Sequence, residues 1–220
     1  MKPKVITCRV MLDEFRALMP DGTEFEIFEI SQHSRPVALR AALQAAVEAA
    51  DGCYDPIFLG YGLCSQATVG IVAQKSRLVV FRTDDCIGIF LGSRQVQRER
   101  AHKEPGSYFL SRGWIGNGVG SVFDEYDRMT QRYGTARGTS LFKKMLAHYR
   151  RLVHIVMPGA ATLDSDRGFA RGNAERFGLD YVEVEGTNAL IKRMVEGGSG
   201  GDILVVRPGQ PISLDAMLEK

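Results

Sequence analysis

The chain has 220 residues, of which 45% are hydrophobic and 25% charged, as expected for one large globular domain or two small ones. Its formal net charge is +2, with 28 basic against 26 acidic side chains, so charge predicts no nucleic-acid-binding and no membrane-binding surface. No apolar run has the length of a signal peptide core or a membrane span, which predicts a cytoplasmic protein.

The first part of the chain alternates predicted strands with predicted helices. Short apolar, β-branched or alternating runs predict strands at 4–10, 24–30, 55–62 and 76–83. An alanine- and leucine-rich segment predicts a helix over 35–52, stopped by Gly52, and a shorter helix is expected at 65–75. This order predicts an α/β fold with a mostly parallel sheet and helices on both of its faces.

The second part begins with a charged helix that is expected to start near Gly92 and to end before Pro105. The glycine-rich, aromatic stretch 107–121 is predicted to be a loop, and 121–152 to be helical in two pieces. The last third alternates again, with strands expected at 152–159, 180–186 and 201–209 and helices at 168–177 and 187–196. We therefore predict two small Rossmann-like lobes, residues 1–125 and 126–220; a single continuous sheet is the alternative.

Three cysteines and one histidine follow directly on the predicted strands. Cys8 closes the first strand, His33 follows the second, Cys64 the third and Cys86 the fourth. The carboxyl ends of parallel strands share one edge of the sheet, where open α/β proteins build their ligand sites, so these side chains are expected to converge. Cys53 follows a helix at the opposite end of its strand and is excluded from the site.

The four side chains at this edge are the ligand types that suit zinc or an iron–sulfur cluster. A disulfide framework is not indicated, because four cysteines in a reducing compartment are metal-binding, catalytic or simply buried. A metal site of Cys8, Cys64, Cys86 and His33 is therefore the leading interpretation. Cysteines that merely fill the core, with His33 as an ordinary loop residue, are the alternative.

Further polar residues lie at the same edge. Asp84 and Asp85 precede Cys86 and are the candidate catalytic residues, as a general base or as groups that orient a ligand; a polar turn is the alternative. The stretch after Cys86 resembles a helix start that offers backbone N–H groups to an anion, although many such starts are simple caps. The candidate substrate-binding residues are Gly92, Ser93, Arg94 and Tyr108.

Three blocks in order, "LGYGLCS" (59–65), "DDCIGIFLGSR" (84–94) and "PGSYFLSRGW" (105–114), resemble the DUF1638 family of bacterial and archaeal proteins of unassigned function. The resemblance extends over most of the chain and is least distinctive in the C-terminal third. Members of that family often carry histidine before the Asp-Cys pair, whereas this chain has Asp84, so no histidine role transfers to that position. Because some relatives occur near corrinoid methyl-transfer systems, the resemblance implies a corrinoid-system protein as a candidate partner.

Four functions remain open on the sequence. The leading one is a metal-dependent transferase or lyase, in which bound zinc lowers the pKa of a substrate thiol, as in methyl transfer. The second is an iron–sulfur protein with an open iron that binds substrate. The third is a non-catalytic metal- or cofactor-binding accessory protein, and the fourth is a plain α/β binding module with core thiols. The expected partner is a small-molecule substrate, with no nucleic acid and no membrane.

Overall fold

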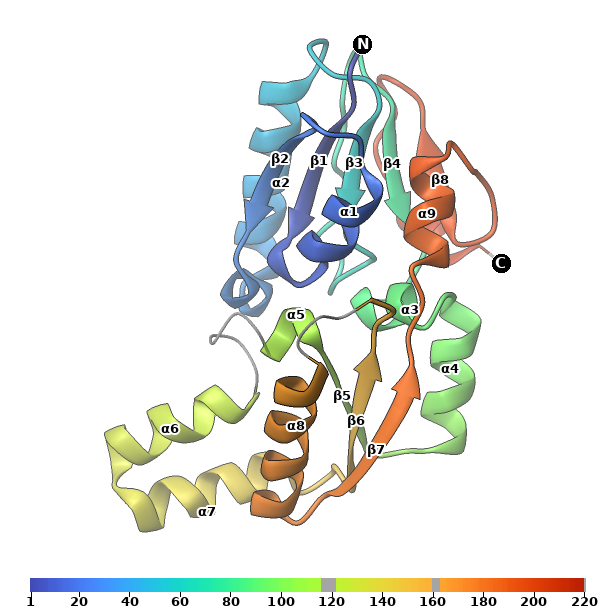
Figure 1. Cartoon of the computed structure of the whole chain (residues 1–220). Coiled ribbons are helices and arrows are strands. Elements are labelled where there is room, and N and C mark those ends of the chain that lie inside the picture. Colours follow the sequence, from blue (N-terminus) through green and yellow to red (C-terminus); the bar gives the residue numbers. More distant parts are fainter. Residues whose placement is uncertain (116–121, 160–162, 220) are drawn as a thin grey trace. The chain divides into compact units, whose positions relative to one another are not determined.

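The computed structural model describes residues 1–115, 122–159 and 163–219, and the chain divides into two compact units (Figure 1). Unit 1 comprises residues 1–96 and 187–220, and unit 2 comprises residues 97–186. This division differs from the predicted boundary between residues 125 and 126. The physical reason is that the C-terminal segment pairs with the sheet of the N-terminal segment, a long-range contact that no local pattern signals.

Unit 1 contains a five-stranded sheet in the order β2-β1-β3-β4-β8. Its strands are β1 (Lys4–Cys8), β2 (Glu24–Phe28), β3 (Ile57–Gly60), β4 (Leu78–Phe81) and β8 (Ile203–Val206). The first four run parallel, which confirms the mostly parallel sheet, and β8 pairs antiparallel with β4. β1, β3 and β4 are buried along their whole length, as is typical of a sheet covered on both faces.

Helices cover both faces of this sheet, as predicted for a Rossmann-like fold. They are η1 (Arg9–Met11), α1 (Leu12–Leu18), η2 (Ile30–Ser34), α2 (Pro36–Ala50), α3 (Cys86–Phe90), α9 (Ala189–Val195) and α10 (Leu214–Leu218). The chain turns from β1 to β2 in one direction and from β2 to β3 in the other, so right-handed crossovers place α1 and α2 on opposite faces. Figure 1 shows α1 and α9 together on one face, and these two helices contact each other.

The predicted helix over 65–75 is wrong. These residues form turns, and Cys64, Ser65 and Gln66 have φ values of 45°, 56° and 65°. Such left-handed backbone is incompatible with a right-handed helix that begins at these residues. Left-handed backbone was not predicted at these positions, because none of the three residues is a glycine.

Unit 2 contains a three-stranded parallel sheet in the order β5-β6-β7. The strands are β5 (Ser107–Ser111), β6 (Arg151–Val156) and β7 (Asp180–Glu185), and the helices are α5 (Arg112–Ile115), α6 (Val122–Tyr133), α7 (Thr135–Met145) and α8 (Leu163–Phe177). The predicted loop over 107–121 is wrong for its described part, which forms β5 and α5; residues 116–121 lie outside the described residues. The break predicted between two helices at 133–140 is confined to Gly134, which has a φ of 77°, and residues 135–140 belong to α7.

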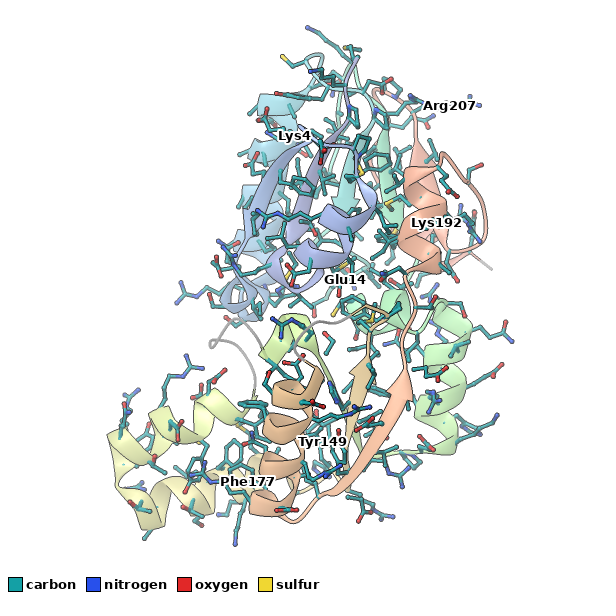
Figure 2. All side chains as sticks on the ribbon, in the orientation of Figure 1. Lys4, Glu14, Tyr149, Phe177, Lys192 and Arg207 are labelled. Atoms are coloured by element: carbon teal, nitrogen blue, oxygen red, sulfur yellow. The ribbon has the colours of Figure 1, made fainter. Side chains whose placement is uncertain are left out.

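The core of unit 2 is aromatic. Phe177 of α8 lies between its own helix and the α6–α7 hairpin (Figure 2), with ring centroids 4.6 Å from Phe142 and 5.7 Å from Phe123. Helix α4 (Arg94–Lys103) begins in unit 1 and continues into unit 2. Across the part of the chain that the structure describes, no helix has the length and apolarity to cross a membrane.

Candidate functional site

The parallel sheet of unit 1 has a topological switch point between β1 and β3. The chain leaves β1 toward β2 on one side, and it leaves β3 toward β4 on the other. Open α/β sheets bind ligands in the crevice beyond the carboxyl ends of the strands at such a point. Cys8 is the last residue of β1, and Tyr61 and Cys64 follow β3 within four residues. The fold therefore places two of the predicted thiols at the position where it favours a ligand.

Cys8 and Cys64 share one buried environment with Tyr61. Their exposed fractions are 3%, 9% and 1% respectively. Burial is the main cause that raises the pKa of Cys8 to about 11 and that of Cys64 to about 12. Charge on Cys8 further raises the pKa of Cys64, and charge on either cysteine raises that of Tyr61. The three side chains are therefore close enough to sense one another electrostatically.

The backbone around Cys64 is strained and firmly anchored. The N–H of Leu63 donates to the Thr83 carbonyl at 2.8 Å, and the N–H of Cys64 donates to the Asp84 carbonyl at 3.0 Å. These bonds tie the turn after β3 to the turn after β4. Left-handed backbone costs about 1–2 kcal/mol at a residue other than glycine, and such strain gathers at functional sites. The anchoring fixes Cys64 in this conformation.

His33 lies beside Tyr61 in a form that suits ligand binding. Its ring stacks on Tyr61 with centroids 6.0 Å apart and an interplanar angle of 27°. Its Nδ1 lies 3.1 Å from the Ile30 carbonyl oxygen, which can only accept, so Nδ1 carries the hydrogen. Burial lowers the His33 pKa, with Asp85 opposing that shift. A neutral ring with Nδ1–H has a free lone pair on Nε2, the arrangement that metal-binding histidines use.

The two predicted carboxylates have different surroundings. Asp85 caps α3 by accepting a hydrogen bond from the Ile87 N–H at 2.9 Å, and its charge raises the pKa values of Cys64 and His33. Asp85 therefore borders the thiol group. Asp84 instead pairs with Arg94, whose Nη2 lies 2.7 Å and whose Nε lies 2.9 Å from the Asp84 Oδ1. Asp84 is thus engaged in an ion pair with a buried guanidinium.

The predicted substrate-binding residues have structural contacts. Arg94 is only 7% exposed, and besides Asp84 it holds the Met217 carbonyl at 3.0 Å. The Ser93 hydroxyl accepts a hydrogen bond from the Val96 N–H at 3.1 Å, as an ordinary cap of α4.

Gly92 and Tyr108 also have local structural roles. Gly92 has a φ of 86° in the turn between α3 and α4. Tyr108 belongs to unit 2, where its ring packs edge-on against Phe123 and Tyr149.

Within residues 1–115, 122–159 and 163–219, no three His, Cys, Asp or Glu side chains lie in an arrangement that could hold a metal ion. The donor chemistry of Cys8, Cys64 and His33 nevertheless suits a soft metal. Cys86, the first residue of α3, is partly exposed, whereas Cys53 is exposed at the amino edge of the sheet. Metal binding at the thiols would therefore require local side-chain rearrangement.

Tyr61 is a candidate site residue that the sequence analysis missed. It stands between Gly60 and Gly62, and this arrangement was the available signal. A side chain at Gly62 would place its Cβ 2.6 Å from both the carbonyl oxygen and the hydroxyl of Thr83. Glycine at this position therefore lets the turns after β3 and β4 approach each other closely.

A cavity of about 370 Å³ in unit 1 lies away from the thiols. Its lining includes Pro3, Pro56 and Arg77, which precede β1, β3 and β4, so it opens at the amino edge of the sheet. Apolar side chains of Met19 and Met194 line it as well. It is spatially separate from the candidate site at the carboxyl edge.

Fold and site together define a Rossmann-like α/β protein with a buried thiol cluster at the switch point of its parallel sheet. The sequence profile of the family described as "Protein of unknown function (DUF1638)" matches residues 27–195, and the chain belongs to this family. His33, Cys64 and Cys86 lie inside the matched range, and Cys8 lies before it.

Two further comparisons add little to this assignment. One solved structure, described as "Crystal structure of a small-chain dehydrogenase", is similar at 14% identity and a TM-score of 0.23, covering 87% of this chain and 100% of its own. No curated protein matches.

Proposed function

We propose that this chain is a metal-dependent enzyme whose site lies at the carboxyl edge of the sheet of unit 1. The observation that carries the proposal is the gathering of Cys8, Cys64 and His33 around Tyr61 at the topological switch point. Cys8, Cys64 and Cys86 would hold zinc or an iron–sulfur cluster, with His33 as a further ligand. Zinc is the favoured ion, and the cytoplasm, where thiols stay reduced, is the proposed location.

The protonation of the thiols argues against a nucleophilic role for either cysteine on its own. With pKa values of about 11 and about 12, Cys8 and Cys64 are thiols near neutral pH, and thiols are poor nucleophiles. Asp85 adds a negative charge that disfavours their ionisation further. A bound divalent ion reverses this balance because it stabilises thiolates directly. The buried pair is thus better suited to ligation than to acting alone as a nucleophile.

When bound, the metal would supply Lewis acidity that lowers the pKa of a substrate thiol, the chemistry of zinc-assisted methyl transfer. Around it, His33 is held in one tautomer by the Ile30 carbonyl, and Asp85 is held at the start of α3. Asp85 would orient the substrate or accept its proton. Asp84 and Arg94 hold the turn that carries Cys86.

Metal analysis of the protein purified without a tag under anaerobic conditions tests this proposal. About one zinc per chain is expected, and Cys8→Ala, Cys64→Ala and Cys86→Ala should each lose most of it. Cys53→Ala is the matched control, because its thiol is exposed at the other edge, and it should keep the metal. His33→Ala should retain more metal than the cysteine variants. A wild-type protein without stoichiometric zinc or iron would refute the proposal.

Iron with a broad visible absorption would instead favour an iron–sulfur protein with an open iron, which uses the same cysteines. A non-catalytic accessory protein that serves a corrinoid system is a second candidate function. The position of the 370 Å³ cavity at the opposite edge favours it, because an accessory protein needs no substrate space beside its metal. Such a protein would bind metal yet show no turnover with small thiols.

A further inference from the structure

One long stretch of unit 2 carries basic side chains and no acidic ones. Residues 128–163 contain seven lysines and arginines but no aspartate or glutamate. The expectation that no nucleic acid binds rested on the formal net charge of the whole chain, +2, which conceals this local excess. Basic side chains gathered on one part of a protein are typical of a surface that binds a polyanion.

Helix α7 presents part of this charge on a solvent-exposed face. Its opposite face is buried through Gly138 and Phe142. Arg137, Ser140 and Lys144 are all exposed, and their spacing of three and four residues aligns them along one stripe of the helix. The cationic side chains of this stripe therefore point away from the core of unit 2.

An open hollow of about 470 Å³ lies on the same side of α7. It is lined by Ala136, Thr139, Ser140, Lys143, Lys144 and Ala147. Among the described residues, no carboxylate lines this hollow and neither lysine is paired with an acidic side chain. The hollow is thus bordered by two unpaired ammonium groups and by hydroxyls, which suits a ligand that carries several phosphates.

An exposed aromatic ring lies beside the start of α7. Tyr133, the last residue of α6, is 43% exposed. The guanidinium carbons of Arg132 and Arg137 lie 5.4 Å and 5.7 Å from the centroid of its ring. Surfaces that bind single-stranded nucleic acids combine these two features, because bases stack on the ring while the cations bind the phosphates. Tyr133, Arg137, Ser140, Lys143 and Lys144 are called the basic face of α7 below.

We propose that the basic face of α7 binds single-stranded RNA, with a base stacked on Tyr133 and phosphates bound by Arg137, Lys143 and Lys144. A duplex fits less well, because its bases are stacked on one another and do not reach the ring. The exposed Ser140 hydroxyl among the cations favours RNA over DNA, since it can hydrogen-bond to a ribose 2′-hydroxyl. This inference uses no residue of the thiol cluster and does not depend on the proposed function.

Fluorescence anisotropy of a labelled single-stranded RNA of about 20 nucleotides, titrated with the full chain between about 50 and 200 mM salt, tests the inference. The wild type should bind with a Kd of about 10⁻⁶ to 10⁻⁴ M that rises with salt. The triple variant Arg137→Gln, Lys143→Gln, Lys144→Gln should bind about tenfold more weakly. Its plot of log affinity against log salt should be shallower by about 2, because each lost phosphate contact removes about 0.7.

The matched control is the triple variant Lys2→Gln, Lys192→Gln, Arg207→Gln, which removes the same charge from exposed positions of unit 1. Its affinity for the RNA should stay within about twofold of the wild type, because the basic face keeps all of its cations. A wild type that binds no RNA at the lowest salt would overturn the inference. Equal losses of affinity in the two triple variants would overturn it as well, because the effect would then come from net charge alone.

Tyr133 distinguishes RNA from other polyanions. Tyr133→Leu should bind the RNA about fivefold more weakly at an unchanged salt dependence, because it removes the stacking ring but no charge, whereas Tyr133→Phe should bind like the wild type. Polyglutamate and single-stranded DNA of the same sequence should bind more weakly than the RNA. Polyglutamate that binds as tightly as RNA would identify an acidic protein as the partner, and tighter binding of DNA would identify the other nucleic acid. Either result would overturn the assignment to RNA.

Discussion

At the scale of single residues, burial rather than any specific partner sets the chemistry of the site. Burial is the main cause of the raised pKa values of Cys8 and Cys64, and the charge of Asp85 adds to the shift at Cys64. The positions of these two cysteines at the edge of the sheet were predicted from the ends of the strands that they follow. The depth of their burial was not predicted, because burial depends on helices packed from elsewhere in the chain.

The first prediction concerns alkaline stability of the metal-free protein. A thiol whose pKa rises on folding from 9.0 to about 12 stabilises the folded state fully below pH 9 and loses this contribution as the pH rises further. Each such thiol should remove about 1.4 kcal/mol of unfolding free energy per pH unit above pH 9. Urea unfolding at pH 8 to 11 measures this loss.

Tyrosines and lysines titrate in the same range, so the informative quantity is the difference between variants. Cys64→Ala should lose less stability between pH 9 and 11 than the wild type, whereas Cys53→Ala should follow the wild type. Parallel curves for the wild type and Cys64→Ala would contradict the burial of Cys64 as a thiol.

Arg94 gives the second prediction. It was predicted to bind substrate, but it is buried and holds Asp84 and the Met217 carbonyl. Arg94→Met removes the hydrogen bonds from Arg94 to the Asp84 carboxylate and to the Met217 carbonyl, so the unfolding free energy should fall by about 2–3 kcal/mol. Arg207→Met, at an exposed position, should change it by less than about 0.5 kcal/mol. An Arg94→Met protein as stable as wild type would contradict this structural role of Arg94.

At the scale of elements, local patterns predicted most strands and long helices but not the turns that build the site. β1, β3, β4, β6 and α2 follow from their apolar or alanine-rich runs. The helix predicted over 65–75 is wrong because Cys64, Ser65 and Gln66, which ordinarily favour right-handed backbone, are left-handed, and the Cys64 N–H is bonded to the Asp84 carbonyl in the turn after β4. β5 lies in a stretch that was predicted to be a loop, because its serines and the glycines that follow it are more typical of loops than of strands.

The third prediction rests on the close approach of the turn after β3 to the turn after β4. A Cβ at Gly62 would lie 2.6 Å from the Thr83 carbonyl oxygen, so Gly62→Ala must push the turn after β4 away from Cys64. The unfolding free energy should fall by about 2 kcal/mol or more, and metal retention should fall with it.

Gly168→Ala is the control, because a Cβ there meets nothing within 4 Å and α8 gains a better helix former. Its stability should be equal or higher, with metal content unchanged. Chemical denaturation and metal analysis of the two variants measure both effects. Wild-type stability for Gly62→Ala would contradict the close packing of the turns.

At the scale of the whole molecule, the sequence predicted two Rossmann-like units but not which residues belong to each. The missing information was long-range: β8 pairs antiparallel with β4, about 120 residues earlier in the chain, and brings residues 187–220 into unit 1. The different domain boundary does not affect the candidate site, because all of its thiols precede residue 97. The switch point lies between Cys8 and Cys64 because of the order of the strands in the sheet, which the positions of the strands along the chain do not reveal.

X-ray absorption at the metal edge of the natively purified protein tests the central claim most directly. A site held by Cys8, Cys64 and Cys86 should show three sulfur neighbours at about 2.3 Å, and the edge itself distinguishes zinc from iron. Loss of this sulfur shell in Cys64→Ala, but not in Cys53→Ala, would complete the assignment. A first shell of nitrogen and oxygen only, or no bound metal, would contradict it and leave these cysteines as buried core residues.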